Sequence, residues 1–203
     1  MRTRVAVWMY STLQFSDLTV GESAGPSDRG TLPPMAHPND ELIQRFYAAF
    51  ARRDGDAMAE CYAPSARFSD PVFVDLKDEE PGAMWRMLTG RSQDLVVTLR
   101  EHEADDASGR ARWLADYTFS TGNKVHNDVL ARFRFQDGLI VEHIDSFSFY
   151  AWSRQALGGI GRFLGWTPLI RNMVRHKARA GLDEFLGRPA VEPRRRRRQG
   201  IRR

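Results

Sequence analysis

The sequence predicts an α+β protein in which three helices precede a curved antiparallel sheet. Apolar residues recur at helical spacing between residues 38 and 90, and four strand-like runs with short turns follow up to residue 150. Strands joined by short turns pair with their neighbours as an antiparallel meander. Helices that come before such a meander pack on one of its faces, so we expect two layers around one core.

The first helix is expected in the run PNDELIQRFYAAFARR, because Pro38 suits a first helical turn and two carboxylates follow it. A second, short helix is expected in DAMAECY, followed by a short strand, ARFSD. The third helix begins near Pro81 and ends near Gly90. The apolar stripe of the first helix consists of Leu42, Ile43, Phe46, Tyr47 and Phe50.

The meander is expected in four runs that alternate between apolar and polar residues. Segments rich in Gly, Asn and Asp separate these runs, as β-turns require. The runs are LVVTLREHE, RARWLADYTFS, KVHNDVLARFRF and LIVEHIDSFSFY.

A further helix is expected after the sheet. Thr167 can cap this helix, Pro168 can start it, and it runs to about Leu186. Its apolar side is accompanied by several cations, which leaves two interpretations open. The helix covers a sheet edge or a dimer seam, which we prefer, or it is a basic amphipathic helix at a membrane surface.

Four segments are therefore expected along the chain. A disordered or spurious extension occupies residues 1–37, because it is rich in Gly, Ser and Pro and Met35 comes just before the first helix. The α+β domain occupies residues 38–150, and the helical extension occupies 151–187. A disordered, arginine-rich tail occupies 188–203.

Charge and cysteine content limit the class of protein. The net charge is +4, but seven arginines lie in the last ten residues, so the basic balance belongs to the tail. Such a tail could bind nucleic acid or anionic lipid without specificity, although a solvated end is the simpler interpretation. The single cysteine, Cys61, excludes a disulfide framework and favours a reducing, cytoplasmic location. No run approaches the roughly 18 apolar residues of a membrane span.

Strand alternation indicates which polar side chains share a face. In the last strand, Val141, His143, Asp145, Phe147 and Phe149 point to one side. An imidazole and a carboxylate among phenylalanines indicate a pocket with polar groups in apolar walls. Each residue has a structural alternative, since His143 could be a satisfied core histidine and Asp145 could bond to backbone. The pocket wall is expected to include Tyr117, Asn127, Trp85, Phe46, Trp113, Phe119 and Phe147.

Asp70 lies in an otherwise apolar stretch, YAPSARFSDPVF. It is either a turn residue before Pro71 or a carboxylate held in an apolar pocket, where its pKa would rise. No spacing of ligands typical of a metal site is present, and neither a glycine-rich phosphate loop nor a Gly-x-Ser-x-Gly elbow occurs. We therefore expect no metal and no cofactor.

The order of these elements resembles the nuclear transport factor 2-like superfamily, and within it the SnoaL-like branch. The resemblance covers roughly residues 38–150 and rests on LIQRFYAAFARRDGDAMAECYAPSARFSDPVF and FRFQDGLIVEHIDSF. It implies a cone-shaped sheet over the three helices, and a homodimer that forms through the open side of the sheet. The fold hosts many activities, and some members have none.

The resemblance extends to ketosteroid isomerase, an enzyme whose general base falls on Asp70 here. The two oxyanion donors of that enzyme are not matched, because Phe46 and Ala131 stand in their places and Tyr47 is expected to face elsewhere. Losing one such donor costs about 10²–10³ in rate, so steroid isomerisation is not expected.

The segment IVEHIDSF is similar to the one that carries the acid–base aspartate of SnoaL-like polyketide cyclases, which corresponds to Asp145. Limonene epoxide hydrolase shares the fold and uses an Asp–Arg–Asp relay, but no arginine is expected on the inner faces of the strands. The leading hypothesis is a small-molecule pocket protein, an isomerase or cyclase acting on an apolar carbonyl compound through Asp70, Asp145 and His143. The alternatives are a non-catalytic binding or interaction module and an epoxide hydrolase-like enzyme.

Overall fold

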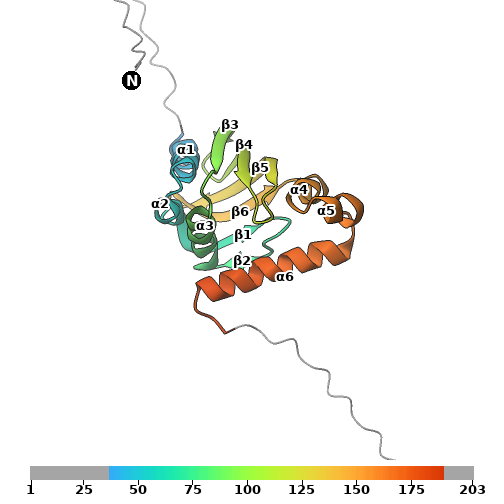
Figure 1. Cartoon of the computed structure of the whole chain (residues 1–203). Coiled ribbons are helices and arrows are strands. Elements are labelled where there is room, and N and C mark those ends of the chain that lie inside the picture. Colours follow the sequence, from blue (N-terminus) through green and yellow to red (C-terminus); the bar gives the residue numbers. More distant parts are fainter. Residues whose placement is uncertain (1–36, 190–203) are drawn as a thin grey trace, which may run out of the picture. The chain divides into compact units, whose positions relative to one another are not determined.

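The computed structural model describes residues 37–189. The predicted extension at 1–37 and the predicted tail at 188–203 therefore lie almost entirely outside the described residues. Within them, three helices precede four long strands, as the sequence predicts (Figure 1). The α+β class is confirmed.

The N-terminal helices are α1 (Pro38–Ala51), α2 (Gly55–Ala59) and α3 (Glu80–Arg91). The His37 ring accepts a hydrogen bond from the amide of Asn39 and so caps α1, one residue before the expected proline. The Asp54 carboxylate caps α2 by accepting from the amide of Ala57. Helices α2 and α3 approach so closely that a Cβ at Gly55 would lie 2.6 Å from the Arg86 Cα.

Six strands form one curved, unclosed sheet in the order β2-β1-β6-β5-β4-β3. The meander β3–β6 is antiparallel throughout. Strand β1 joins it by pairing parallel to β6, so the segment before α3 lies beside the last strand of the sheet. The strands are β1 (Tyr62–Ser69), β2 (Leu76–Lys77), β3 (Val96–Ala104), β4 (Ser108–Thr118), β5 (Lys124–Gln136) and β6 (Leu139–Ser146).

Three details differ from the prediction. Strand β1 is a full strand of eight residues rather than a short one. Strand β6 ends at Ser146, and Phe149 begins a helix that Ser148 caps, so Phe149 does not continue the strand face. A register shift in the β5–β6 ladder lies next to Val141, so Ile140, rather than Val141, is fully buried beside His143.

The C-terminal extension contains three helices instead of one: α4 (Phe149–Ala156), α5 (Gly159–Leu164) and α6 (Pro168–Phe185). Thr167 caps α6 as expected, by accepting from the amide of Ile170. Helices α4 and α5 lie at the opposite end of the sheet from α1–α3, and the long helix α6 runs back from there towards α3 (Figure 1).

Ion pairs fix the second half of α6 to α3. The Glu80 carboxylate, 8% exposed at the start of α3, accepts from Arg179 at 2.6 Å and from Arg188 at 2.5 Å. Nearer the middle of α6, the Arg175 Nε donates to the carbonyl oxygen of Pro71 at 3.0 Å. The extension is therefore attached directly to the segment that follows Asp70.

Two apolar clusters fill the described fold. The larger one lies between α1–α3 and the sheet, and the smaller one lies between the sheet and α4 and α6. Val72, Tyr117 and Phe147 are partly buried and pack against both clusters. They mark the boundary between the helical layer and the C-terminal extension.

Candidate functional site

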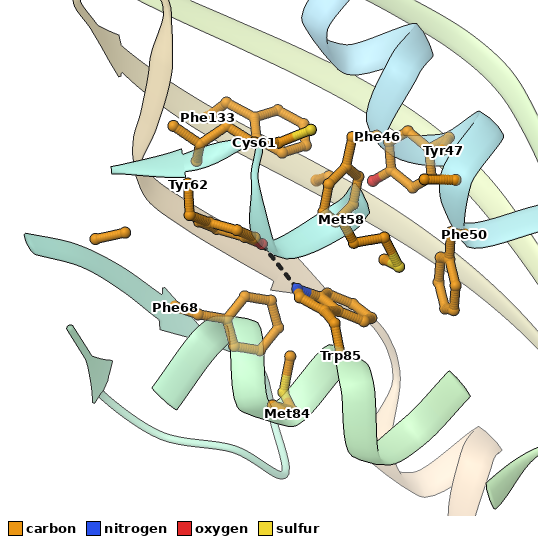
Figure 2. Close-up of a cluster of buried hydrophobic side chains, with 14 of the residues drawn as sticks. Phe46, Tyr47, Phe50, Met58, Cys61, Tyr62, Phe68, Met84, Trp85 and Phe133 are labelled. Carbon is orange, nitrogen blue, oxygen red and sulfur yellow. Dashed lines mark hydrogen bonds between the residues drawn. The ribbon is translucent and has the colours of Figure 1, made fainter. Parts of the chain in front are cut away.

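A chain of hydrogen bonds crosses the larger cluster and is centred on His143, which is completely buried. Its Nδ1 lies 2.6 Å from the Tyr62 hydroxyl, which also accepts from the Trp85 Nε1 at 2.9 Å. Its Nε2 lies 3.0 Å from the Asp145 Oδ1. Figure 2 shows the first link of this chain, from Trp85 to Tyr62, among the surrounding aromatic rings. Strands β1 and β6 bring Tyr62 and His143 together although 81 residues separate them.

One arrangement of protons satisfies every member of this chain. The Tyr62 oxygen already accepts from Trp85, so its own proton is free to go to His143 Nδ1. The imidazole is then neutral and its Nε2 proton points at the carboxylate of Asp145. Burial raises the pKa of Tyr62 well above 10, which keeps the hydroxyl protonated as a donor.

The His143 ring has no room for a further partner. Rings of five aromatic side chains lie around it at centroid distances of 4.3 to 6.2 Å. Because both ring nitrogens are occupied and the residue is 0% exposed, His143 does not face an open pocket. These surrounding side chains are Phe46, Tyr62, Phe68, Trp85 and Phe133.

Asp145, 4% exposed, is the acidic end of the chain. Its Oδ1 accepts from His143 and lies 3.5 Å from the Trp113 Nε1. Among the hydrogen bonds within residues 37–189, those to Asp145 all go to Oδ1, so Oδ2 is left for another partner. The residue that pairs with Asp145 across the sheet is Ala131, which has a small apolar side chain and offers the carboxylate no hydrogen bond.

Tyr47 contributes a second buried hydroxyl near this carboxylate. Its ring lies 5.7 Å from that of Trp113, and its hydroxyl is the buried side-chain polar atom without a partner among the described residues. Burial raises the pKa of Tyr47 well above 10, and the negative charge of Asp145 raises it further. Tyr47 therefore presents an uncommitted hydrogen-bond donor inside the same cluster.

Asp70 combines both of the roles that its sequence context left open. Its Oδ1 accepts from the amides of Val72, at 2.6 Å, and of Phe73, so the side chain fixes the turn after β1. By its exposed surface Asp70 is only partly buried. Burial of its carboxyl group nevertheless raises the pKa of Asp70 to about 7, against the lowering effect of the amides of Phe73 and Val72. The charge of Asp145 raises this pKa and that of Arg175 lowers it, so the three charged groups are near one another.

Tyr117 lies near Asp70 from the side of the sheet. Its hydroxyl accepts from the Trp152 Nε1 at 2.9 Å, which ties it to α4. Burial raises the pKa of Tyr117, and the charge of Asp70 contributes to the rise. Asn127 is partly buried on the same face of β5 as Val125 and Val129. Both polar groups face inward, as strand alternation predicts.

A separate open hollow of about 370 Å³ lies where β4 and β5 meet α4. Tyr117 and Val125 line it, together with Lys124, His126 and Gln155. Of the residues expected to surround the pocket, it includes only Tyr117. Asp70, Asp145 and His143 are not part of this hollow.

Most of the residues that the sequence assigned to the pocket wall are found in the two clusters. Phe46, Trp85 and Trp113 lie in the larger cluster, Phe119 packs on the smaller one, and Phe147 touches both. Sequence reasoning missed Tyr47, Tyr62 and Arg175. The stripe of α1 included Tyr47 as a core residue but gave it no part in the site, whereas the charge of Asp145 acts on its hydroxyl.

Residues 37–189 contain no group of three or more His, Cys, Asp or Glu side chains placed to hold a metal ion. No helix in this range is long and apolar enough to cross a membrane.

Comparisons with known proteins assign the fold and the family. Solved structures with this topology include an LEH-like epoxide hydrolase from M. tuberculosis, with 19% identity and a TM-score of 0.53 over 63% of this chain and 95% of that one. A putative polyketide cyclase from Xanthomonas campestris has 21% identity and a TM-score of 0.51 over 59% of this chain and 96% of that one. A hypothetical protein with a ketosteroid isomerase-like fold from Catenulispora acidiphila, bound to trimethylamine, has 16% identity and a TM-score of 0.52 over 63% and 98%.

These likenesses define the class: the described domain has the nuclear transport factor 2-like fold. Residues 43–143 also match the family model of the SnoaL-like domain. The chain therefore belongs to the SnoaL-like family, as its sequence resemblance predicts. No curated protein matches the sequence. The aligned share of this chain is smaller than the range 37–189, so part of the described structure is additional to the fold of these neighbours.

Proposed function

We propose that this SnoaL-like domain binds a small, mostly apolar carbonyl compound and catalyses proton transfer on it, as an isomerase or a cyclase. The observation that carries the proposal is the pair of carboxylates, Asp70 and Asp145, in surroundings where burial raises the pKa of Asp70 to about 7. A group that titrates near neutral pH is well matched to acid–base catalysis. The fold neighbour from Xanthomonas, described as a putative polyketide cyclase, supports the same reaction class.

The ligand would bind at the boundary between the two apolar clusters. Val72, Tyr117 and Phe147 line this boundary and are only partly buried, so they can move aside at lower cost than the fully buried cluster around His143. Asp70 lies two residues before Val72, and Asp145 lies two residues before Phe147. A carbonyl compound seated there would meet both carboxylates and apolar walls.

The roles follow from which atoms are free. Asp145 takes the proton from the carbon next to the carbonyl through Oδ2, because Oδ1 is held by His143 and Trp113. The electron pair of the broken C–H bond moves to the carbonyl oxygen, which becomes an enolate. Protonated Asp70 donates to that oxygen, and the Tyr47 hydroxyl is a second candidate donor. The enolate then either takes the proton held by Asp145 at another carbon, or attacks a second carbonyl within the same molecule, whose oxygen receives that proton.

His143 acts in this scheme as a positioning residue. It does not reach the ligand, because it is completely buried and both nitrogens are bonded. The chain from Trp85 through Tyr62 holds the imidazole, and the imidazole holds one oxygen of Asp145. This replaces the direct acid–base role for His143 that we expected from the sequence.

Epoxide hydrolysis is a second candidate, favoured by one observation. The sequence placed no arginine on the inner strand faces, but Arg175 reaches the Asp70 turn from α6 and its charge lowers the pKa of Asp70. Two carboxylates with a neighbouring arginine resemble the Asp–Arg–Asp relay of limonene epoxide hydrolase. One carboxylate would then activate a water and the other would protonate the epoxide oxygen.

Hydrogen–deuterium exchange on the ligand tests the leading proposal without knowledge of the product. A panel of apolar ketones is incubated with the protein in D₂O, and loss of the α-proton signal is followed by NMR. The wild type should catalyse exchange on at least one ketone, and Asp145→Asn should reduce it by about 10²-fold or more. Asp137→Asn, the same chemical change at an exposed residue in the turn between β5 and β6, is the control and should exchange as the wild type does.

The outcomes separate the candidates. Binding of ketones without exchange would indicate a non-catalytic binding module. Opening of apolar epoxides without ketone exchange, abolished by Asp145→Asn, would favour the hydrolase. We also propose a homodimer through the outer face of the sheet and a cytoplasmic location, which sedimentation velocity and fractionation of the source cells can test.

A further inference from the structure

Exposed apolar side chains are concentrated in one part of the described chain. Of the eleven large hydrophobic side chains that are exposed between residues 37 and 189, six lie between residues 160 and 173. Phe163, Leu169 and Trp166 are 74%, 75% and 68% exposed. We call this group the α5–α6 apolar patch; it consists of Ile160, Phe163, Leu164, Trp166, Leu169 and Met173.

The patch is continuous along two helices rather than scattered. Ile160, Phe163 and Leu164 lie on α5, and Trp166 lies in the turn before α6, where its Nε1 donates to the Phe163 carbonyl at 3.2 Å. Leu169 and Met173 are four residues apart on α6, so they share one face, and Ile170 on another face is buried. Helix α6 is thus apolar on two sides, one against the domain and one against solvent.

The charge along this stretch of the sequence has one sign. Between Asp145 and Asp183 the sequence contains six arginines and lysines and no carboxylate. Arg175 and Arg179 are engaged with the domain, at Pro71 and Glu80. The four other cations of this stretch are exposed; they are Arg154, Arg162, Arg171 and Lys177.

This combination selects the kind of partner. Large exposed aromatic and aliphatic side chains, in a helical stretch that carries cations and no carboxylate, are typical of helices that lie in the headgroup region of an anionic membrane. A second copy of the same patch would bring cations against cations, which disfavours a symmetric pair. Nucleic acid would satisfy the cations but would leave the leucine, isoleucine and phenylalanine side chains without an apolar partner.

We therefore propose that the α5–α6 apolar patch docks this protein onto the surface of an anionic lipid bilayer. Phe163, Trp166 and Leu169 enter the headgroup region, while Arg162 and Lys177 contact lipid phosphates and carboxylates. This function is independent of the proposed chemistry, since the patch lies outside the boundary with Asp70 and Asp145. Docking would bring the domain to the place where apolar small molecules concentrate.

Vesicle co-sedimentation of the full chain tests the proposal. The wild type should bind phosphatidylcholine vesicles that contain about one-third phosphatidylserine more tightly than pure phosphatidylcholine vesicles. The double variant Phe163→Ser/Leu169→Ser should bind the anionic vesicles about tenfold less tightly or weaker, because both side chains lose their apolar environment. Arg162→Gln/Lys177→Gln should lose roughly 30-fold on anionic vesicles and little on neutral ones.

Two controls make the result specific to the patch. Val74→Ser changes an exposed apolar side chain, 53% exposed, in the segment between β1 and β2 and should bind as the wild type does. A Trp8→Phe background removes the tryptophan that lies outside the described residues. In this background Trp166→Phe should still bind, but the blue shift of tryptophan fluorescence on addition of vesicles should be reduced, because Trp85, Trp113 and Trp152 are buried. Circular dichroism of each variant verifies that the fold is kept.

Three results would overturn the proposal. The wild type could fail to bind anionic vesicles. The Phe163→Ser/Leu169→Ser variant could bind as tightly as the wild type, which would assign binding to the seven arginines of residues 194–203 instead. Finally, the same variant could change the molecular mass in solution or abolish binding to a DNA duplex, which would assign the patch to a second copy of the chain or to nucleic acid.

Discussion

Removal of the Tyr62 hydroxyl tests the buried hydrogen-bond chain. The substitution Tyr62→Phe keeps the ring packing but leaves two buried polar atoms without a partner, Trp85 Nε1 and His143 Nδ1. Each unsatisfied buried group costs about 1–3 kcal/mol, so for the two groups together the free energy of unfolding should fall by about 2–6 kcal/mol. A domain of this size is stable by about 5–15 kcal/mol, which makes this loss easy to measure.

The matched comparison is Tyr47→Phe, because Tyr47 is as deeply buried but its hydroxyl has no partner in the described structure. Removing it should leave stability unchanged or raise it by about 1 kcal/mol. Urea unfolding followed by circular dichroism at pH 7 gives both values. The slope of the free energy of unfolding against urea concentration should be the same in the wild type and in both variants. If Tyr62→Phe were as stable as the wild type, or if both variants lost the same amount, the assigned hydrogen-bond chain would be refuted.

Three further predictions concern other parts of the fold. The folded pKa of Asp70, about 7, lies above its unfolded value near 4, so its contribution to stability is full below pH 4 and lost as the pH rises through 7. The free energy of unfolding of Asp70→Asn should therefore rise, relative to that of the wild type, by up to about 2.7 kcal/mol from pH 5 to pH 8. The control is Asp75→Asn, at an exposed carboxylate whose pKa is lowered by Arg67, and its stability relative to the wild type should not change over that range. Gly55→Ala should destabilise the domain by about 2 kcal/mol or more, because the new Cβ would lie 2.6 Å from the Arg86 Cα. Gly90→Ala, whose Cβ would have nothing within 4 Å, should stabilise α3 by about 0.5–1 kcal/mol. Thermal unfolding of both variants measures the two changes, and equal changes would contradict the close packing of α2 on α3. Glu80→Ala should release α6 from α3, because it removes the carboxylate that accepts hydrogen bonds from Arg179 and Arg188. Hydrogen exchange of the backbone amides of residues 168–185 should then become at least tenfold faster, while exchange in β5 is unchanged. The same acceleration in α6 and in β5 would contradict this attachment.

The architecture could be predicted because its signals are local. Helical spacing in α1, the proline at the start of α3 and the Gly-containing turns of the meander each lie within a few residues of the element that they define. The same holds for Thr167 and Pro168 at the start of α6. The end of β6 was missed because Phe147 and Phe149 continue the strand alternation in sequence, although Ser148 caps a helix there.

The site could be predicted only in part, because its contacts are between distant segments. Strand alternation places His143 and Asp145 on one face, and in the structure the His143 Nε2 lies 3.0 Å from the Asp145 Oδ1. Tyr62 reaches His143 only because β1 pairs parallel to β6, and no local pattern encodes that pairing. Arg175 reaches Pro71 across 104 residues of sequence. Such partners appear only when the tertiary packing is known.

The packing around His143 also changes the interpretation of the site. An imidazole on a strand face between phenylalanines predicts a pocket just as well as it predicts a filled core. The rings of Phe46, Phe68 and Phe133 fill the space here, so the proposed binding site is limited to the side of Asp145 and the boundary near Asp70. The volume of the surrounding side chains, rather than the pattern of polar residues, decides between a pocket and a filled core.

The central claim is that Asp70 and Asp145 share one region poor in solvent, and carbon-13 NMR of the aspartate carboxyl groups measures this directly. The account predicts that Asp70 titrates near pH 7 in the wild type and at a lower pH in Asp145→Asn, because burial still raises the pKa of Asp70 but the charge of Asp145 no longer adds to the rise. Titration of Asp70 at the ordinary value of about 4, with no difference between the two proteins, would contradict it.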